Sequence, residues 1–198
     1  MSQLSDVSIM EAMERGHIGI DPWDPSMLQP ASIDVTLGTS WLVPATKGKV
    51  VTVRNRDVSY VSLETTQHYL HPGEFALATT REVITLSDHV AAKFEGKSSL
   101  GRMGIMTHVT AGFIDPGFSG QITLEVCNVS PWTLVFDAGI KIGQLVFTNL
   151  DTPASEGYGS KKWGSRYHGQ RGATGVRSTP LPGVRAEQVG ALDGEANR

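Results

Sequence analysis

The stretch that decides the fold is residues 110–127, which read TAGFIDPGFSGQITLEVC. Its first half contains a Pro-Gly turn, and its second half alternates apolar and polar residues with a period of two. The alternation predicts a strand with Ile122, Leu124 and Val126 on one face. Short segments of the same texture recur, without helical patterns between them, at 33–37, 50–53, 75–77, 83–86 and 140–147. Strands at this spacing predict a mainly β fold, either a sandwich or a small barrel.

The two ends of the chain differ from this β-rich middle. A short helix is predicted over 5–16, where Ser5 or Ser8 can cap the N-terminus and Gly16 is a natural stop. Residues 157–172 are rich in Gly, Ser, Lys and Arg and show no strand pattern. Residues 173–198 have no periodicity, so we expect one folded domain over 1–172 and a flexible C-terminal tail over 173–198.

Composition narrows the class of protein. The 198 residues are 39% hydrophobic and 19% charged, which is ordinary globular composition. A net charge of −3 does not suit a general nucleic-acid binder, so an anionic ligand must meet a local cluster of cations. No apolar run approaches the roughly 20 residues that span a bilayer, and the polar start is unlike a signal peptide. We therefore expect a cytoplasmic protein with no membrane partner.

A single cysteine, Cys127, excludes an internal disulfide framework and zinc sites built on paired cysteines. The zinc-dependent nucleobase deaminases need an H-x-E motif and a P-C-x-x-C motif, and the sequence contains neither. His68 and His71 are three residues apart, but they precede a proline and have no acid or cysteine beside them as further ligands. The sequence therefore assigns no metal ligand.

The densest polar cluster is residues 95–102, EGKSSLGR. Two cations, two hydroxyls and two glycines within eight residues could cradle a phosphate, although such a cluster can equally be a solvated turn. The Gly-Lys-Ser triplet is not a Walker A loop, because Ala91 stands where the first glycine should be. A second cationic cluster, 158–171, is either a solvated linker or a flap that closes over an anionic ligand.

Two carboxylates are candidate catalytic groups, and each could instead have an ordinary structural role. Asp115 precedes the Pro-Gly turn, where it can satisfy local backbone N–H groups or can activate a water. Glu125 shares a strand face with Thr123 and Cys127. If that face is open to solvent, Glu125 is an ordinary surface acid, and if it faces a pocket, Glu125 is a candidate proton shuttle. The sequence pattern leaves both choices open.

Taken together, several blocks in the right order resemble the dCTP deaminase family of the dUTPase-like superfamily. The resemblance runs from about Leu4 to Arg171. Its blocks are QPASID (29–34), HPGEF (71–75), EGKSSLGR (95–102), THVTAGFIDPG (107–117), LE (124–125), IGQL (142–145) and YHGQRG (167–172). Gly112-Phe113, Gln144 and the YHGQRG block are similar to the bifunctional, dUMP-forming members of that family.

The resemblance implies the distorted jelly-roll β-barrel of the dUTPases, assembled as a homotrimer with active sites at the subunit interfaces. It implies hydrolysis of dCTP to dUMP, diphosphate and ammonia, with dUTP as a second substrate and dTTP as an inhibitor. Inhibition would act through the block His108-Val109-Thr110-Ala111, which rearranges in relatives when a thymidine nucleotide binds.

The implied site residues fall into two groups by role. Glu125 would be the general base of deamination, with Ser98, Arg102 and the Ala111 carbonyl holding the water and the base edge. Asp115 would bind the sugar hydroxyl and activate the water that attacks the α-phosphate. Phe118 would pack near the deoxyribose. The triphosphate would carry Mg²⁺ and would be held by Lys97, Ser99, Gln144, Arg166 and Gln170, with Tyr158 beside them.

Two departures from the family pattern affect the flap. Arg166 stands where relatives usually have Lys, which keeps the charge but changes its geometry. Ala173 follows Gly172 where relatives usually have proline, so the flap is expected to order differently.

Three other functions remain to be weighed. A plain dUTPase would have no use for Glu125, and a deaminase that stops at dUTP is disfavoured by Gly112-Phe113 and Gln144. A non-catalytic nucleotide-binding regulator is disfavoured because Glu125, Asp115 and Arg102 are all intact.

Overall fold

The computed structural model describes residues 2–46, 48, 50–53 and 56–177. The strands in this part of the chain are β1 (Ser2–Gln3), β2 (Ile18–Asp21), β3 (Leu28–Gln29), β4 (Ser32–Pro44), β5 (Tyr60–Glu64), β6 (Gln67–Leu70), β7 (Phe75–Leu86), β8 (Val90–Gly96), β9 (Ile105–Met106), β10 (Phe113–Ile114), β11 (Ser119–Asn128), β12 (Leu134–Asp137) and β13 (Lys141–Asn149). The helices are α1 (Asp6–Glu14), the 3-10 turn η1 (Pro25–Met27) and α2 (Ser98–Gly101).

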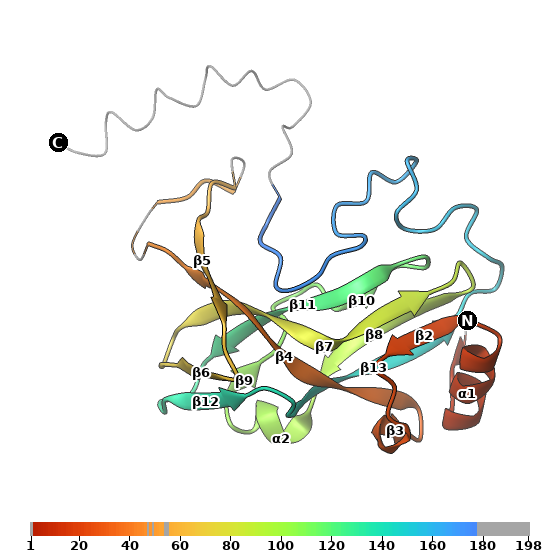
Figure 1. Cartoon of the computed structure of the whole chain (residues 1–198), viewed down its shortest axis with the longest axis horizontal. Coiled ribbons are helices and arrows are strands. Elements are labelled where there is room, and N and C mark those ends of the chain that lie inside the picture. The colour runs from red at the N-terminus through yellow and green to blue at the C-terminus, as the bar shows by residue number, and fades with distance from the viewer. Residues whose placement is uncertain (1, 47, 49, 54–55, 178–198) are drawn as a thin grey trace.

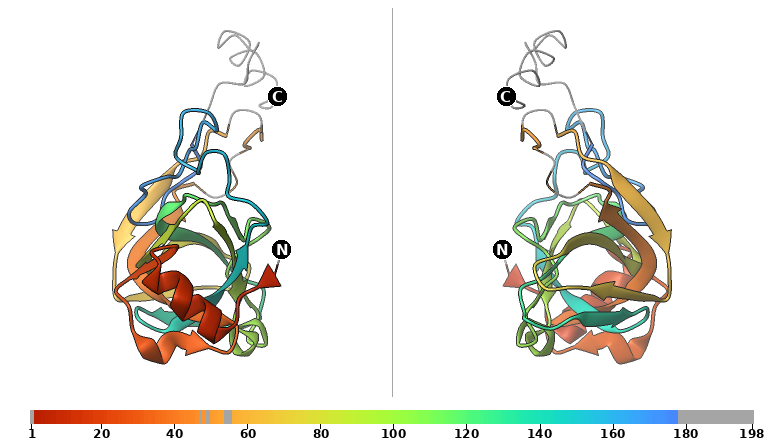
Figure 2. Two further views of the ribbon diagram at one scale, coloured as in Figure 1. Left: turned by 90° about the vertical axis from the view of Figure 1, so that its right-hand side faces the viewer. Right: turned by 90° about the vertical axis from the view of Figure 1, so that its left-hand side faces the viewer.

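Eleven of the strands described form one large sheet that curls on itself (Figures 1 and 2). Its main path runs β10-β8-β13-β4-β7-β11-β9, with β1, β2, β3 and β5 paired at its sides, and β6 pairs with β12 in a separate two-stranded sheet. The core contains aliphatic and aromatic side chains from the inner faces, among them Trp41, Phe94, Phe136 and Phe147. Helix α1 lies against one end, where Ile9 and Ala12 are buried. The prediction of a mainly β barrel with a short N-terminal helix is confirmed.

The predicted strand 122–127 lies at the centre of β11, which pairs with β7. Leu124 and Val126 are fully buried, as the alternation predicts. The register slips between Gln121 and Thr123, and Ile122 packs against the core but is only partly buried. Ile122 and the neighbouring Thr123 both line a cavity.

The predicted helix ends are confirmed, and one predicted strand is wrong. Ser5 caps α1 by accepting the backbone N–H of Ser8, and Gly16 takes a positive φ of 74° just after the helix. The strand expected over 50–53 is wrong, because Val50 and Val53 are 88% exposed in a loop. A β-branched run forms a strand only where a neighbouring strand is available to pair with it.

Residues 150–177 contain no strand and run across the face above β10 and β11 (Figure 1). The first residues of the expected tail, 173–177, are part of this covering. Ala173 N–H donates to Ser40 Oγ at 3.1 Å, and Thr174 N–H donates to Thr123 Oγ1 at 3.1 Å. The rest of the expected tail, 178–198, lies outside the described residues. Within those residues, no helix is long and apolar enough to cross a membrane.

Candidate active site

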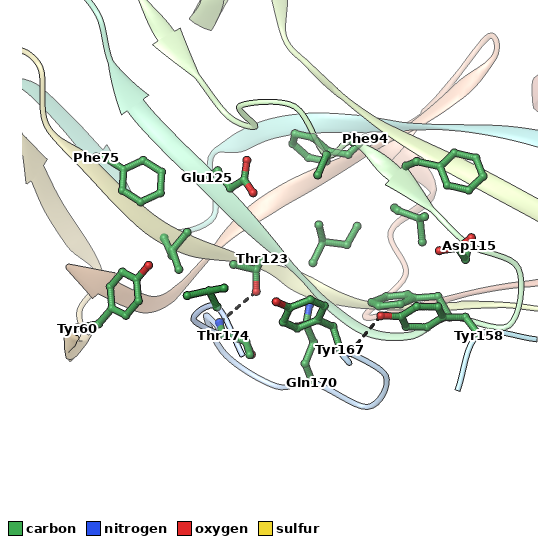
Figure 3. Close-up of a pocket in the computed structure, with 18 residues that line it drawn as sticks. Tyr60, Phe75, Phe94, Asp115, Thr123, Glu125, Tyr158, Tyr167, Gln170 and Thr174 are labelled. Atoms are coloured by element: carbon green, nitrogen blue, oxygen red, sulfur yellow. Dashed lines mark hydrogen bonds between the residues drawn. The ribbon is translucent and has the colours of Figure 1, made fainter. Parts of the chain in front are cut away.

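A cavity of about 390 Å³ lies between β11, the turn before it and the covering C-terminal segment (Figure 3). Glu125 and Asp115 both line it. Apolar and aromatic side chains supply most of the remaining wall, including Phe75, Phe94 and Phe118. A concave, largely apolar space with a few convergent polar groups is the usual form of a small-molecule site.

The position of Glu125 resolves the alternative that the sequence left open. Its side chain points from β11 into the cavity and is partly buried, with Thr123 on the same face (Figure 3). The backbone N–H of Val109 donates to Glu125 Oε2 at 2.9 Å. That bond fixes one carboxylate oxygen and leaves the other available to a water or a ligand.

Asp115 reaches the cavity from the turn between β10 and β11. Among the described residues, no backbone N–H donates to its carboxylate, so its side chain does not serve the turn. The turn itself is held by backbone bonds, in which Phe118 N–H donates to the Asp115 carbonyl at 3.2 Å and Tyr158 N–H donates to the Pro116 carbonyl at 2.6 Å. Gly117 has a φ of 81°, and a Cβ there would lie 2.5 Å from Gly157 Cα. The glycine therefore allows the C-terminal segment to pack directly on the Asp115 turn.

Aromatic side chains and Gln170 form the wall on the side of the C-terminal segment. Phe118 and Tyr158 have ring centroids 6.0 Å apart, and Tyr167 N–H donates to the Tyr158 hydroxyl at 3.1 Å. Gln170 is buried, and its amide nitrogen donates to the Gln121 carbonyl at 2.6 Å. Ala111 also lines the cavity.

A second set of the expected residues lies in a different cavity of about 540 Å³, beside α2. Lys97, Ser98 and Gln144 line it, and Gln144 Oε1 accepts from Ser32 Oγ at 2.9 Å. Lys97 is ion-paired with the buried carboxylate of Asp34, which Lys141 also approaches at 3.1 Å.

The structure thus divides the expected site in two within a single chain. One set, which we call the carboxylate half-site, consists of Ala111, Asp115, Phe118, Glu125, Tyr158 and Gln170. The other, the α2 half-site, consists of Lys97, Ser98 and Gln144, with Ser99 and Arg102 exposed on or just after α2. Arg166 lines neither cavity.

Sequence reasoning missed part of the carboxylate half-site. Tyr60 and Val176 line the cavity from distant parts of the chain, and Thr174 hydrogen-bonds Thr123 above it. Only Thr123, the partner of Thr174, had a sequence signal, because it shares the strand face of Glu125. Burial, with smaller contributions from the nearby Tyr167 and Glu125, raises the pKa of the Tyr60 phenol.

Comparison with known proteins shows the family to which this chain belongs. A family model described as dCTP deaminase-like matches residues 3–150. The chain belongs to the dCTP deaminase-like family.

Relatives of this dCTP deaminase-like chain are similar over most of its length. A protein from Nocardioides sp. named "dCTP deaminase, dUMP-forming" is 47% identical over 186 residues, covering 88% of this chain and 94% of the relative. One of the same name from Tropheryma whipplei is 50% identical over 181 residues, covering 86% and 90%. The crystal structure of 2'-deoxycytidine 5'-triphosphate deaminase from Agrobacterium tumefaciens has the same fold, with a TM-score of 0.55 at 24% identity. That match covers 73% of this chain and 47% of the other.

The donors around the α2 half-site of this dCTP deaminase-like chain are a lysine, hydroxyls and a carboxamide. These groups suit phosphate oxygens better than a bare divalent cation, which prefers carboxylates and carbonyls. The Asp34 carboxylate beside them already accepts from Lys97, Lys141 and Gln29. The residues beside α2 therefore suit phosphate groups and not a cation bound directly to the protein.

Proposed function

We propose that the protein hydrolyses dCTP to dUMP, diphosphate and ammonia, using Glu125 for deamination and Asp115 for cleavage of the triphosphate. The observation that carries the proposal is that both carboxylates line one cavity with a largely apolar, aromatic wall. The names of the relatives support the reaction, and the geometry supports the division of labour.

In the first step, Glu125 takes a proton from a water, and the resulting hydroxide attacks the ring carbon that carries the amino group. A proton then passes to the amino nitrogen, the carbon–nitrogen bond breaks and ammonia leaves, so that a uracil ring remains. The Val109 N–H holds the carboxylate in one orientation, which favours proton transfer along a fixed path. Ala111, on the same cavity wall, would bind the base edge through its carbonyl.

In the second step, Asp115 takes a proton from a water that attacks the α-phosphorus. The bond between that phosphorus and the bridging oxygen breaks, and diphosphate leaves. Lys97, Ser99, Gln144, Arg166 and Gln170 would hold the phosphates, with Tyr158 beside them and Phe118 against the sugar. Mg²⁺ bound to the triphosphate would neutralise the charge that develops on the leaving group.

The active form in this proposal is a homotrimer. The carboxylate half-site supplies acids and an apolar wall, whereas the α2 half-site supplies Lys97 and Ser98 with the exposed Arg102 nearby. A triphosphate needs both sets of groups at once. Packing the α2 half-site of one subunit against the carboxylate half-site of the next would complete each site, as closed symmetry allows.

Inhibition by dTTP would act on the loop that holds Glu125. Val109 N–H binds the carboxylate, so a ligand that moves this loop also moves the general base. His108 in the same loop has a buried Nδ1 without a hydrogen-bond partner among the described residues. In this position of the loop, one buried polar atom therefore lacks a hydrogen bond. We expect dTTP at about millimolar concentration to slow dCTP turnover, and unchanged turnover would contradict this role of the loop.

The test is to incubate the protein with dCTP or with dUTP, each with Mg²⁺, and to identify the products by chromatography. Formation of dUMP from dCTP supports the proposal. Accumulation of dUTP would indicate a deaminase that stops after the first step. Conversion of dUTP alone would indicate a plain dUTPase, and no turnover of either nucleotide would indicate a binding protein.

A further inference from the structure

The segment 172–177 covers the cavity without joining the sheet. Thr174 and Val176 from this segment line the cavity. Its backbone is tied down by side chains of β4 and β11: Gly172 N–H donates to Gln121 Oε1 (2.7 Å), Ala173 N–H to Ser40 Oγ (3.1 Å) and Thr174 N–H to Thr123 Oγ1 (3.1 Å). A segment held by a few side-chain bonds opens more easily than a strand in a ladder.

Besides these hydrogen bonds, the segment makes an apolar contact with the ring of Tyr60. It is the first residue of β5 and faces Pro44 of β4 across the ladder. A Cβ built on Gly175 would lie 3.1 and 3.2 Å from two carbons of the Tyr60 ring. Gly175 therefore lies against the Tyr60 ring, with little room for a side chain between them.

A side chain at position 175 would disturb the contact with the ring but would not strain the backbone. Gly175 is not among the glycines with positive φ, so its conformation is open to other residues. Apart from the Tyr60 ring, the nearest atom to a Cβ would be Leu42 Cδ1 at 3.7 Å, an ordinary contact. A side chain at Gly175 would therefore press on the Tyr60 ring, which would have to move slightly to accept it.

Tyr60 also lines the same cavity as Glu125. Figure 3 shows its ring at the wall, with Thr174 of the covering segment and Glu125 of β11 nearby. The Tyr60 side chain is partly buried, and burial is the main cause of the raised pKa of its phenol.

We propose that Tyr60 is a positioning residue that holds the segment 172–177 closed over the cavity through the contact between Gly175 and its ring. The effect on turnover rests on the function proposed above. When the segment is closed, it excludes water and forms part of the wall of the nucleotide site. Loss of the contact therefore weakens dCTP binding and leaves the two carboxylates in place.

The first experiment measures amide hydrogen exchange of the peptide that covers 172–174 in the free full-length protein. Tyr60→Ala is expected to speed exchange there by about 10-fold or more, because three protected N–H groups lose their shelter when the segment opens. Tyr60→Phe keeps the ring and should stay within about 2-fold of wild type. Tyr69→Ala is the matched control, because Tyr69 is an exposed tyrosine of β6 outside the cavity. Unchanged exchange in Tyr60→Ala would overturn the proposal.

The second experiment is a double-mutant cycle that remains informative if Tyr60→Ala perturbs the sheet. Gly175→Val should speed exchange at 172–174 by about 10-fold in the wild-type background, because its side chain meets the ring. In the Tyr60→Ala background it should add less than about 2-fold. Changes in chain entropy from replacing glycine act in both backgrounds and cancel. Equal effects of Gly175→Val in both backgrounds would show that the ring is not what it meets.

Kinetics connect the contact to the reaction. We expect Tyr60→Ala to raise KM for dCTP by about 10-fold while kcat changes by less than about 3-fold, with recovery in Tyr60→Phe. A fall in kcat at unchanged KM would contradict a closing role. A wild-type protein without dCTP turnover would end the proposed function, whereas the exchange cycle would still decide whether Tyr60 holds the segment.

Discussion

The division of the site into two half-sites predicts that two inactive variants restore each other's activity. Glu125→Gln removes the base from the carboxylate half-site and keeps the size of the side chain. Arg102→Ala removes a cation from the α2 half-site. Arg102 is exposed, so its truncation should leave the fold of the subunit intact.

The expected recovery follows from how the half-sites combine. If each site takes the carboxylate half-site from one subunit and the α2 half-site from its neighbour, random mixing of equal amounts gives about a quarter of the sites two intact halves. If both halves come from the same subunit, every site keeps one defect and no activity returns. The two arrangements therefore differ by about a quarter of wild-type dCTP turnover against none.

The assay needs subunits that exchange freely. Both variants are produced in one cell, or are unfolded together in urea and refolded, and the rate of dUMP formation from dCTP is compared with that of each variant alone. Preformed oligomers mixed without exchange serve as the control and should remain inactive. No recovery after verified exchange would refute the shared site, and an active monomer in light scattering would refute it independently.

Three further predictions concern stability, pH and metals. A Cβ on Gly143 would run into the ring of Phe94, so Gly143→Ala should lower the free energy of unfolding by about 1–3 kcal/mol in urea titrations, whereas Gly101→Ala, with open space around it, should not. Burial lowers the pKa of His68, which stacks on Trp41, below its ordinary value of 6.5. As pH falls, the unfolded chain therefore takes up a proton at a higher pH than the folded protein does, and folding stability should be lost below about pH 6.5. His68→Gln should reduce the fall in Tm between about pH 7.5 and about pH 5.5. An equal fall in Tm in both proteins would contradict this role of His68. A zinc-selective chelator should leave dCTP turnover unchanged while removal of Mg²⁺ suppresses it, and loss of activity that zinc restores would contradict the proposed mechanism.

Local patterns in the sequence predicted most of the β architecture. The alternation over 122–127 specified which side chains of β11 enter the core, and Leu124 and Val126 lie there. The same reasoning failed at 50–53, because strand formation there depends on a partner that the fold does not supply. It also could not foresee the register slip at Ile122, since the slip arises from pairing with β7.

The candidate site was only partly predictable, for a related reason. The alternation placed Glu125 opposite the core face, but whether that face meets solvent or a cavity depends on segments far along the chain. Tyr60 covers it from an edge strand whose other residues are exposed, and 172–177 covers it from a stretch without any periodicity. No local signal marks such long-range closure. The separation of Lys97 from Glu125 likewise became visible only in three dimensions.

The central claim is that Glu125 and Asp115 perform different steps, and the ratio of two activities in one variant tests it most directly. Glu125→Gln removes a general base, so deamination of dCTP should fall by about 100-fold or more. Hydrolysis of supplied dUTP should fall much less, because its attacking water lies at the α-phosphate. Asp115→Asn should reduce hydrolysis more than deamination, although loss of its sugar contact would weaken binding of both nucleotides. Glu125→Gln should therefore lower the ratio of dCTP deamination to dUTP hydrolysis by well over 10-fold. An equal fall of both activities in a correctly folded Glu125→Gln protein would contradict it.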